Sequence, residues 1–508
     1  MIKDRREFLK TAATMAFAPM AFATNFDNLF SQININSLSE LKTYLSEHIN
    51  KVAQKMFVSG SVFGVYHKGE QILIANGKRN INTGEPMTTD TAWLLGSITK
   101  VLTTTLLLKY VEAGKIDLDA PVVKYLENFR LKEPGAAEKI IVKQLINHTN
   151  GIDAGTLTPT SEYGPNAVKS YVDALSEMGT LFSPGEFIHY SNPGYSLAGR
   201  LIEKFSGKPF NLALEEEIYK PIGMSRSSTS AEQAILDRTA VGAFVDSKGE
   251  FRSTNMFMLP VSAAAAGATP IVTVEDIIAF GRTHLNDGIA PNGKRILNRE
   301  LISSMHTPTF DSRSPNVPPI GLGWWLIPIG GTTAWWHSGG SPGGYSNLTV
   351  LPEHDLVLAS FNTGPGSAAM NEVISRIVLE DYLGLKLSVP FKTKKPTKPM
   401  SYYTGVYELF QSRYTIKEVE DGLIVNSKFL PFNEEQIRIL SNFSGGNTEA
   451  PDIKLKLIQD NLFKVESLDE DYFASFTGRF GLMSFHSLGN ATKPTHLQMR
   501  LRAAKKVS

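Results

Sequence analysis

Segments with strand character occur near both ends of the first 390 residues and are separated by a long helical stretch. Residues 62–66 and 72–75 read as a β-hairpin, and strand-like runs return only at 324–361. Between about 115 and 330 the pattern is mostly short helices joined by Pro- and Gly-rich loops. We therefore predict an α+β fold, in which one antiparallel sheet is built from both ends, flanked by helices, and a helical subdomain is inserted.

Three helices are predicted with particular clarity. Residues 38–56 place apolar side chains on one helical face. Thr273 precedes an acidic first turn and an apolar run, which is a typical capped helix start. A helix over about 366–384 closes the region.

The pattern of residues in the sequence changes after residue 388. Residues 389–401 form a basic, Pro-rich linker, and residues 402–508 hold short strand-like runs with tight turns such as Asp421-Gly422 and Asp460-Asn461. Evenly spaced hairpins of this kind predict a small antiparallel β-barrel. We find no cluster of catalytic residues in it. The expected domains are thus 24–388, a linker, and 402–508.

Composition excludes several classes of function. The chain has no cysteine, which removes disulfides, thiolate metal sites and cysteine nucleophiles, and its net charge is only +1. Neither a nucleic-acid surface nor an acidic partner is indicated. No apolar run after the N-terminus is long enough to span a membrane, so we expect no integral segment in the mature chain.

The N-terminus resembles an export signal. Arg5-Arg6 precede a weakly apolar segment that ends in Ala21-Phe22-Ala23. Paired arginines followed by a small-x-small site indicate a twin-arginine signal peptide over residues 1–23, with an amphipathic helix as the alternative. We expect the twin-arginine export machinery as a partner, and a bacterial periplasm or the exterior as the destination.

Ser97 and Lys100 lie where an apolar helix over residues 101–111 begins. Three residues apart on a helix, they share one face, so the amine can take the hydroxyl proton. The free N–H groups and the dipole of the first turn favour a developing oxyanion. The same spacing at Ser39 and Lys42 is most simply an exposed helical turn. The pattern alone therefore leaves a catalytic and a structural role about equally open.

A second candidate segment is Tyr190-Ser191-Asn192, within a loop indicated by its Pro and Gly content. A phenol beside a lysine ammonium ionises more readily, so Tyr190 is a candidate base toward Ser97 and acid toward the leaving group. The Asn192 amide can hold a substrate carbonyl and the Lys100 amine. The alternative is a Tyr that covers core and an Asn that bonds its own backbone.

A third segment, His337-Ser338-Gly339-Gly340, follows a predicted strand. Glycines there let a substrate backbone approach, and a strand N–H can complete an oxyanion hole. His337 is a candidate for binding a carboxylate or assisting proton transfer, with a structural role as the alternative. Four of the five tryptophans gather nearby, where core packing is the default and walls of an apolar pocket the other interpretation: Trp324, Trp325, Trp335 and Trp336.

Taken together and in this order, Ser97-x-x-Lys100, Tyr190-x-Asn192 and His337-x-Gly339 resemble the three motifs of the serine β-lactamase and penicillin-binding-protein superfamily. The likeness is nearer to its class C and D-Ala-D-Ala carboxypeptidase branch and runs from about 38 to 385. Supporting phrases are Gln144 to Ile152, Tyr195 to Gly199 and Pro352-Glu353. The tail, from Tyr403-Thr404-Gly405-Val406-Tyr407 onward, is similar to the lipocalin-like domain that some members carry.

The resemblance implies a role for each matching residue. Ser97 would be the acylated nucleophile, and Lys100 with Tyr190 the acid/base pair. Asn192, His337 and Gly339 would bind substrate, and the N–H groups of Ser97 and Gly340 would form the oxyanion hole. His337 departs from the family, which usually has Lys there. Lys is a fixed cation for a substrate carboxylate, whereas His is mostly neutral near pH 7, so we do not expect an efficient β-lactamase.

One competing motif is Gly339-Gly340-Ser341-Pro342-Gly343, which fits the Gly-x-Ser-x-Gly elbow of α/β-hydrolases. That elbow joins a strand to a helix, but strand-like residues follow Ser341. We interpret it as the loop after the third motif. No His-Glu-x-x-His pattern occurs, and we expect neither a metal nor another cofactor.

The sequence thus predicts an exported serine hydrolase that forms an acyl-enzyme on Ser97 and cleaves an amide or ester. A short peptide with a D-residue, or a small ester, is the expected substrate. A carboxylesterase or weak β-lactamase on the same site is the first alternative. A slow-turnover cell-wall-binding or sensor protein is an alternative from another class.

Overall fold

The computed structural model describes residues 35–154, 164–246, 248–386, 393–430, 434, 436–438, 451–468, 476 and 478–508. The predicted signal peptide, residues 1–23, lies outside these described residues. Within them, no helix is long and apolar enough to cross a membrane.

A six-stranded antiparallel sheet forms the centre of the larger part of the chain, with the strand order β2-β1-β12-β11-β10-β9. Strand β1 pairs with β12, Gly60 opposite Thr363, so the sheet joins the two ends of this part as predicted. The strands are β1 (Gly60–His67), β2 (Glu70–Gly77), β9 (Trp325–Ile329), β10 (Thr332–Ser341), β11 (Gly344–Leu351) and β12 (Leu356–Thr363).

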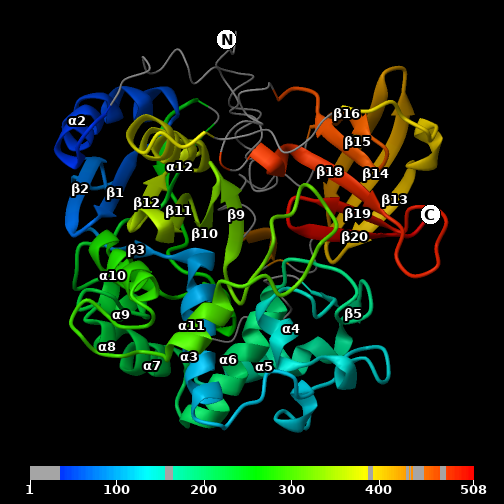
Figure 1. The fold of residues 1–508 in the computed structure, drawn as a ribbon, viewed down its shortest axis with the longest axis horizontal. Helices are drawn as coiled ribbons and strands as arrows, with labels where there is room; N and C mark the ends of the chain where they lie inside the picture. The colour runs from blue at the N-terminus through cyan, green and yellow to red at the C-terminus, as the bar shows by residue number, and fades with distance from the viewer. Residues whose placement is uncertain are drawn as a thin grey trace.

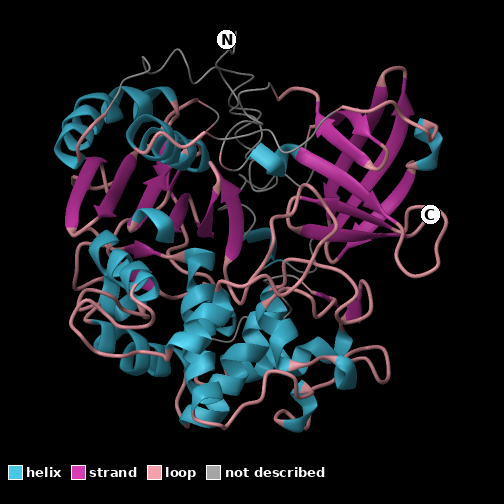
Figure 2. Cartoon of the chain, viewed as in Figure 1, coloured by secondary structure: helices cyan, strands magenta, loops and turns pink. Residues whose placement is uncertain are grey.

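Helices cover both faces of this sheet (Figures 1 and 2). On one face lie α2 (Leu38–Lys55) and α12 (Ser367–Arg376), which continues into the π-helical turn Ile377–Tyr382. Helix α10 (Val274–Leu285), capped by Thr273 as predicted, packs on the other face. Each face buries its own apolar cluster, and these two clusters form the core.

The inserted helical region packs beside the sheet and surrounds α3 (Thr99–Glu112), which is buried on nearly every side. Its longest neighbour, α6 (Asn192–Ser206), contacts α3 along its length. The other helices of the region are α4 (Val142–Ile146), α5 (Ala167–Ala174), α7 (Phe210–Leu214), α8 (Lys220–Ile222), α9 (Ala231–Ala234) and α11 (Arg299–Met305). Short paired strands tie it together: β3 (Trp93–Leu94) with β8 (Ile271–Val272), β4 (Ile152–Asp153) with β5 (Gly179–Thr180), and β6 (Ala243–Val245) with β7 (Phe251–Ser253).

The C-terminal strands close into an eight-stranded antiparallel barrel, at the right of Figure 1. Aromatic rings fill part of its interior, and the Tyr407 hydroxyl donates to the Tyr403 carbonyl at 3.0 Å. The strands are β13 (Gly405–Leu409), β14 (Ser412–Val419), β15 (Gly422–Phe429), β16 (Ile453–Gln459), β17 (Leu462–Val465), β18 (Leu482–His486), β19 (His496–Met499) and β20 (Arg502–Lys506).

The predicted fold class is thereby confirmed: a mixed α/β part built on an antiparallel sheet, followed by a small barrel. The domain boundaries at residues 388 and 402 stay predictions. The barrel packs against the helical part through polar contacts. Asn316 Nδ2 donates to the Gln498 carbonyl at 3.2 Å, and the Phe410 N–H donates to Asp153 Oδ1 at 2.6 Å.

Candidate active site

Ser97 lies in a single 3₁₀ turn, Gly96–Ile98, that leads into α3. The turn is fixed on both sides, since the Leu95 N–H donates to the Pro270 carbonyl at 2.8 Å. Gly267 packs so closely that a Cβ there would lie 2.8 Å from the Ser97 nitrogen. Ser97 is partly exposed, whereas Gly96 and Ile98 on either side of it are buried. The sequence prediction of a serine at the start of an apolar helix agrees with this placement.

Lys100 lies one turn further along and is fully buried. Its Nζ lies 3.1 Å from Ser97 Oγ and donates to the Ala266 carbonyl at 2.6 Å. Burial lowers the pKa of Lys100 well below its usual range, and the nearby positive charge of Arg502 lowers it further. A neutral amine within reach of a hydroxyl can accept its proton, which is the chemistry that the spacing predicts.

Tyr190 lies two residues before the start of α6, and its ring centroid lies 4.9 Å from Lys100 Nζ. We expected the lysine to ease ionisation of the phenol. Burial instead raises the pKa of Tyr190, and a hydrogen bond with the Ser97 side chain lowers it only in part. The phenol is therefore protonated near neutral pH and can donate or relay a proton, whereas Lys100 is the stronger candidate base.

Asn192 is the first residue of α6 and is buried, so the predicted loop ends just before it. Ser191 caps the helix by accepting from the Gly194 N–H at 3.1 Å, and its own N–H donates to His148 Nδ1 at 3.0 Å. These bonds fix the backbone on which Tyr190 and Asn192 are carried. The predicted substrate contact of Asn192 stays a prediction.

The third motif lies directly against the first. Strand β9 pairs with β10 only from Thr332 to Trp336, so among the described strands His337–Ser341 has no partner on that side. A Cβ built at Gly339 would lie 2.1 Å from the Leu95 carbonyl oxygen and 3.0 Å from the Ser97 nitrogen. Only glycine permits this approach. A Cβ on Gly96 would likewise lie 2.9 Å from the Gly340 nitrogen, so the backbone of the first motif lies against that of the third. The oxyanion hole made of the Ser97 and Gly340 N–H groups stays a prediction.

His337 is 2% exposed and lies within the same cluster, 6.3 Å from Tyr190 between ring centroids. Its Nδ1–H donates to the Ser338 carbonyl at 2.7 Å, and its Nε2 has no hydrogen-bond partner among the residues that the structure describes. Burial lowers the pKa of His337 to about 3, and the charge of Lys100 adds to the effect. The imidazole is neutral, so it does not offer a cation to a carboxylate.

Three residues of the site were not singled out by sequence reasoning. His148 is fully buried, with its ring centroid 4.6 Å from that of Tyr190, and it accepts the Ser191 N–H. Ala266 supplies the carbonyl that holds Lys100. Arg502, on β20, places its guanidinium carbon 5.5 Å from the Tyr190 ring centroid. His148 stands within a phrase that supported the resemblance; no local pattern marks Ala266 or Arg502.

Ser341 ends β10 and is separated from β11 only by Pro342 and Gly343. A strand, and not a helix, follows it, so the nucleophile-elbow interpretation is excluded by the topology. No group of three or more metal-ligating side chains occurs within the described residues.

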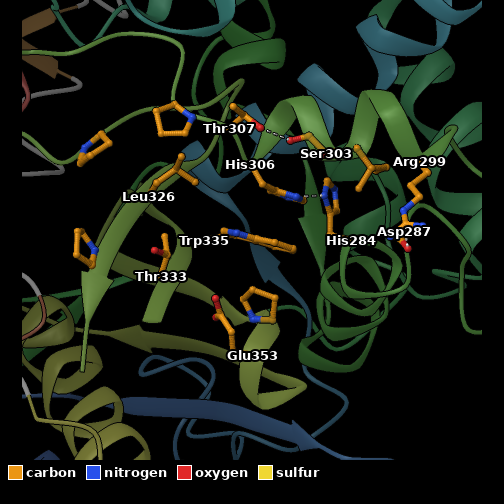
Figure 3. Close-up of a pocket in the computed structure, with 15 residues that line it drawn as sticks. His284, Asp287, Arg299, Ser303, His306, Thr307, Leu326, Thr333, Trp335 and Glu353 are labelled. Atoms are coloured by element: carbon orange, nitrogen blue, oxygen red, sulfur yellow. Dashed lines mark hydrogen bonds and ion pairs between the residues drawn. The ribbon is translucent and has the colours of Figure 1, made fainter. Parts of the chain in front are cut away.

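The default interpretation, core packing, is confirmed for three of the four clustered tryptophans. Trp324 and Trp325 are fully buried in the core and Trp336 is nearly so. Trp335 instead lines a pocket of about 410 Å³ between the β9–β10 hairpin and α10–α11, where its ring stacks on His306 at 3.3 Å (Figure 3). None of the three predicted catalytic residues lines that pocket.

A serine and a lysine at the start of a buried helix, packed against an antiparallel sheet flanked by helices, define the class of β-lactamase-like serine hydrolases. The sequence matches the Beta-lactamase family over residues 49–381. The chain belongs to that family and is a serine hydrolase.

Three similar proteins bear on the fold and function. Penicillin-binding protein 4 of Amycolatopsis lactamdurans is 29% identical over 368 residues, which cover 71% of this chain and 96% of that protein. The D-amino acid amidase of Ochrobactrum anthropi SV3 is 25% identical, with a TM-score of 0.55 over 66% of this chain and 96% of its own. The structure of SurE is 22% identical and shares the fold, with a TM-score of 0.71 over 93% of this chain and 100% of that one.

Proposed function

We propose that this chain hydrolyses an amide or ester bond through an acyl-enzyme on Ser97. One observation carries the proposal: Lys100 Nζ lies 3.1 Å from Ser97 Oγ, in surroundings that lower its pKa. In the first step Ser97 Oγ attacks the substrate carbonyl and its proton passes to the Lys100 amine. The proton reaches the leaving group through the Tyr190 hydroxyl. Water then attacks the acyl-enzyme, which releases the acid and restores the serine.

The proposed substrate is a short peptide or amide that contains a D-amino acid, or a small ester. The likeness to a D-amino acid amidase and to a penicillin-binding protein supports the first class. The neutral His337 supports the view that penicillins are poor substrates, since the third motif offers their carboxylate no cation. A carboxylesterase or a weak β-lactamase on the same residues is the second candidate.

The test compares three substrates: a nitrophenyl ester, a chromogenic cephalosporin and a D-amino-acid amide. Intact-protein mass spectrometry during turnover should reveal an acyl adduct that disappears in Ser97→Ala. Turnover without any adduct on Ser97 would overturn the proposal. A stoichiometric adduct that never hydrolyses would support the other class of function, a cell-wall-binding or sensor protein.

We propose further that the chain is exported through the twin-arginine pathway and acts in the periplasm or outside the cell. The paired Arg5-Arg6 and the Ala21-Phe22-Ala23 site support this. Replacing both arginines by lysine should retain the uncleaved chain in the cytoplasm, as followed by cell fractionation and N-terminal sequencing. Export of that variant at the normal level would contradict the proposed route.

A further inference from the structure

A cation is missing from the third motif but is present elsewhere in the site. His337 stands where the resembling family usually has Lys, and burial keeps it neutral. Lys100 is itself deprotonated when it acts as the base. Neither residue is therefore a fixed positive charge for a substrate. Among the described residues, the guanidinium that lowers the pKa of both Lys100 and Tyr190 belongs to Arg502, which the barrel supplies.

The backbone holds Arg502 at this place. It follows the turn between β19 and β20, and both of its neighbours bond to adjacent residues of the segment that leads into the second motif. The Tyr190 N–H donates to the Leu501 carbonyl at 2.7 Å, and the Ala503 N–H donates to His189 Nδ1 at 3.1 Å. The side chain is thereby directed over the Tyr190 ring, with Cζ 5.5 Å from its centroid.

The guanidinium is desolvated yet forms no ion pair within the part of the chain that the structure describes. Burial lowers the pKa of Arg502, although an arginine stays charged at any physiological pH. Asp153 is the carboxylate that acts on it, and its Oδ1 is occupied by the Phe410 N–H. A partly buried arginine without a salt-bridge partner costs free energy, and a carboxylate that binds to it offsets that cost.

We propose that Arg502 is a carboxylate-binding residue of the active site, so that the barrel completes the site and selects substrates with a carboxylate near the scissile bond. The inference rests on the proposed acyl-enzyme function of Ser97. A guanidinium binds a carboxylate through two parallel N–H bonds, which fixes the orientation of the substrate as well as its charge. The barrel thus supplies a cation beside Tyr190, at a different place from the third motif.

The test uses the full chain and two matched substrates, a D-amino-acid dipeptide with a free C-terminal carboxylate and the same dipeptide as its C-terminal amide. Arg502→Met should lower kcat/KM for the free carboxylate by about 10- to 100-fold, the loss of one charge-assisted hydrogen-bonding partner, and change that for the amide by about 2-fold or less. Arg502→Lys should recover part of the loss. Lys505→Met, an exposed cation on the same strand, is the control.

The outcomes separate this inference from the proposed function. An equal loss on both substrates would mean that Arg502 acts through Lys100 and Tyr190 or supports the fold, and would overturn the carboxylate assignment. Unchanged kinetics on both would overturn it as well. The acyl adduct on Ser97 is read by mass spectrometry in the same samples. If no adduct forms even in the unsubstituted chain, it is the proposed function that fails.

Discussion

The backbone N–H of Tyr190 donates a hydrogen bond of 2.7 Å to the carbonyl oxygen of Leu501. These residues are far apart in the sequence, one in the segment before α6 and the other in the turn between two barrel strands. Tyr190, a candidate proton donor, is therefore positioned in part by the barrel. The barrel is thus not simply an appended module, because it contacts the segment that carries Tyr190.

Replacing Ser97 by alanine should abolish turnover of every substrate, by about 10⁴-fold or more, because the proposed acyl-enzyme forms on this residue. Stopped assays with a nitrophenyl ester are sensitive enough to measure the activity that remains. The matched control is Ser341→Ala, which removes the serine of the competing elbow motif. We expect that variant to keep its activity. A fluorophosphonate label on Ser341 in the unsubstituted chain would contradict the assignment.

The sheet and the Ser97 region are predictable from sequence because their signals are local. A continuous apolar run marks β12, which is buried along its whole length, and a Ser–Lys pair at the start of an apolar run positions both side chains on one helical face. The closed barrel is predictable for the same reason, since each hairpin carries its own turn residues. Such patterns do not indicate which distant segments of the chain are in contact.

Arg502 and His148 show this limit. Arg502 lies in an ordinary strand start, and only the packing of the barrel on the helical part brings it to Tyr190. His148 adopts a left-handed backbone with φ of 64°, and its role as acceptor for the Ser191 N–H depends on a contact between separate loops. The protonation state of Tyr190 cannot be predicted from sequence for a related reason. Burial, which raises its pKa, is a property of the tertiary structure.

Lys100→Met should eliminate activity and yet stabilise the fold by about 1–3 kcal/mol near neutral pH. Burying an amine without a carboxylate partner is costly, and an apolar side chain of similar length avoids that cost. Urea unfolding measures the gain. Lys109→Met, on the same helix but only partly buried, should change stability by less than about 0.5 kcal/mol. A clear destabilisation by Lys100→Met would show that its bonds to Ser97 and Ala266 outweigh the burial.

The gain from Lys100→Met should depend on pH in one direction. The pKa of Lys100 is lower in the folded than in the unfolded chain, so between the two values the unfolded state binds more protons. In that window the unsubstituted protein becomes more stable as pH rises. The advantage of the methionine variant should therefore shrink from about pH 7 to about pH 10, as the unfolded-state lysine approaches its own pKa. An advantage that grows with pH would mean that Lys100 is not shifted downward.

Gly339 and Gly340 should respond differently to alanine. A Cβ on Gly339 would clash with the Leu95 carbonyl oxygen, whereas the nearest atoms to a Cβ on Gly340 are ring carbons of Tyr345 at 3.9 Å. Gly339→Ala should therefore lose about 1–3 kcal/mol of stability and most of the activity, because β10 moves away from Ser97. Gly340→Ala should fold with nearly normal stability. Calorimetry measures the melting temperatures of the two variants. Equal values would contradict the close approach of Gly339 to the Leu95 carbonyl.

Asn316 offers a way to loosen the barrel without touching the catalytic residues. Its side chain is fully buried, donates to the Leu482 and Gln498 carbonyls at 3.4 and 3.2 Å, and accepts from Ser484 Oγ at 2.8 Å. Asn316→Leu removes these three hydrogen bonds to the barrel, at a cost of about 1–3 kcal/mol.

If the barrel positions the second motif, this loss should reach the Tyr190–Leu501 bond. Hydrogen exchange at the Tyr190 amide should then quicken in Asn316→Leu, and kcat/KM should fall in parallel. The control is Asn426→Leu, an exposed barrel position that bonds Asp452 and lies outside the contacts between the two parts. A destabilised barrel with unchanged exchange at Tyr190 and unchanged kinetics would mean that the two parts touch without being coupled, since the motif would then hold its geometry through His148 and α6 alone.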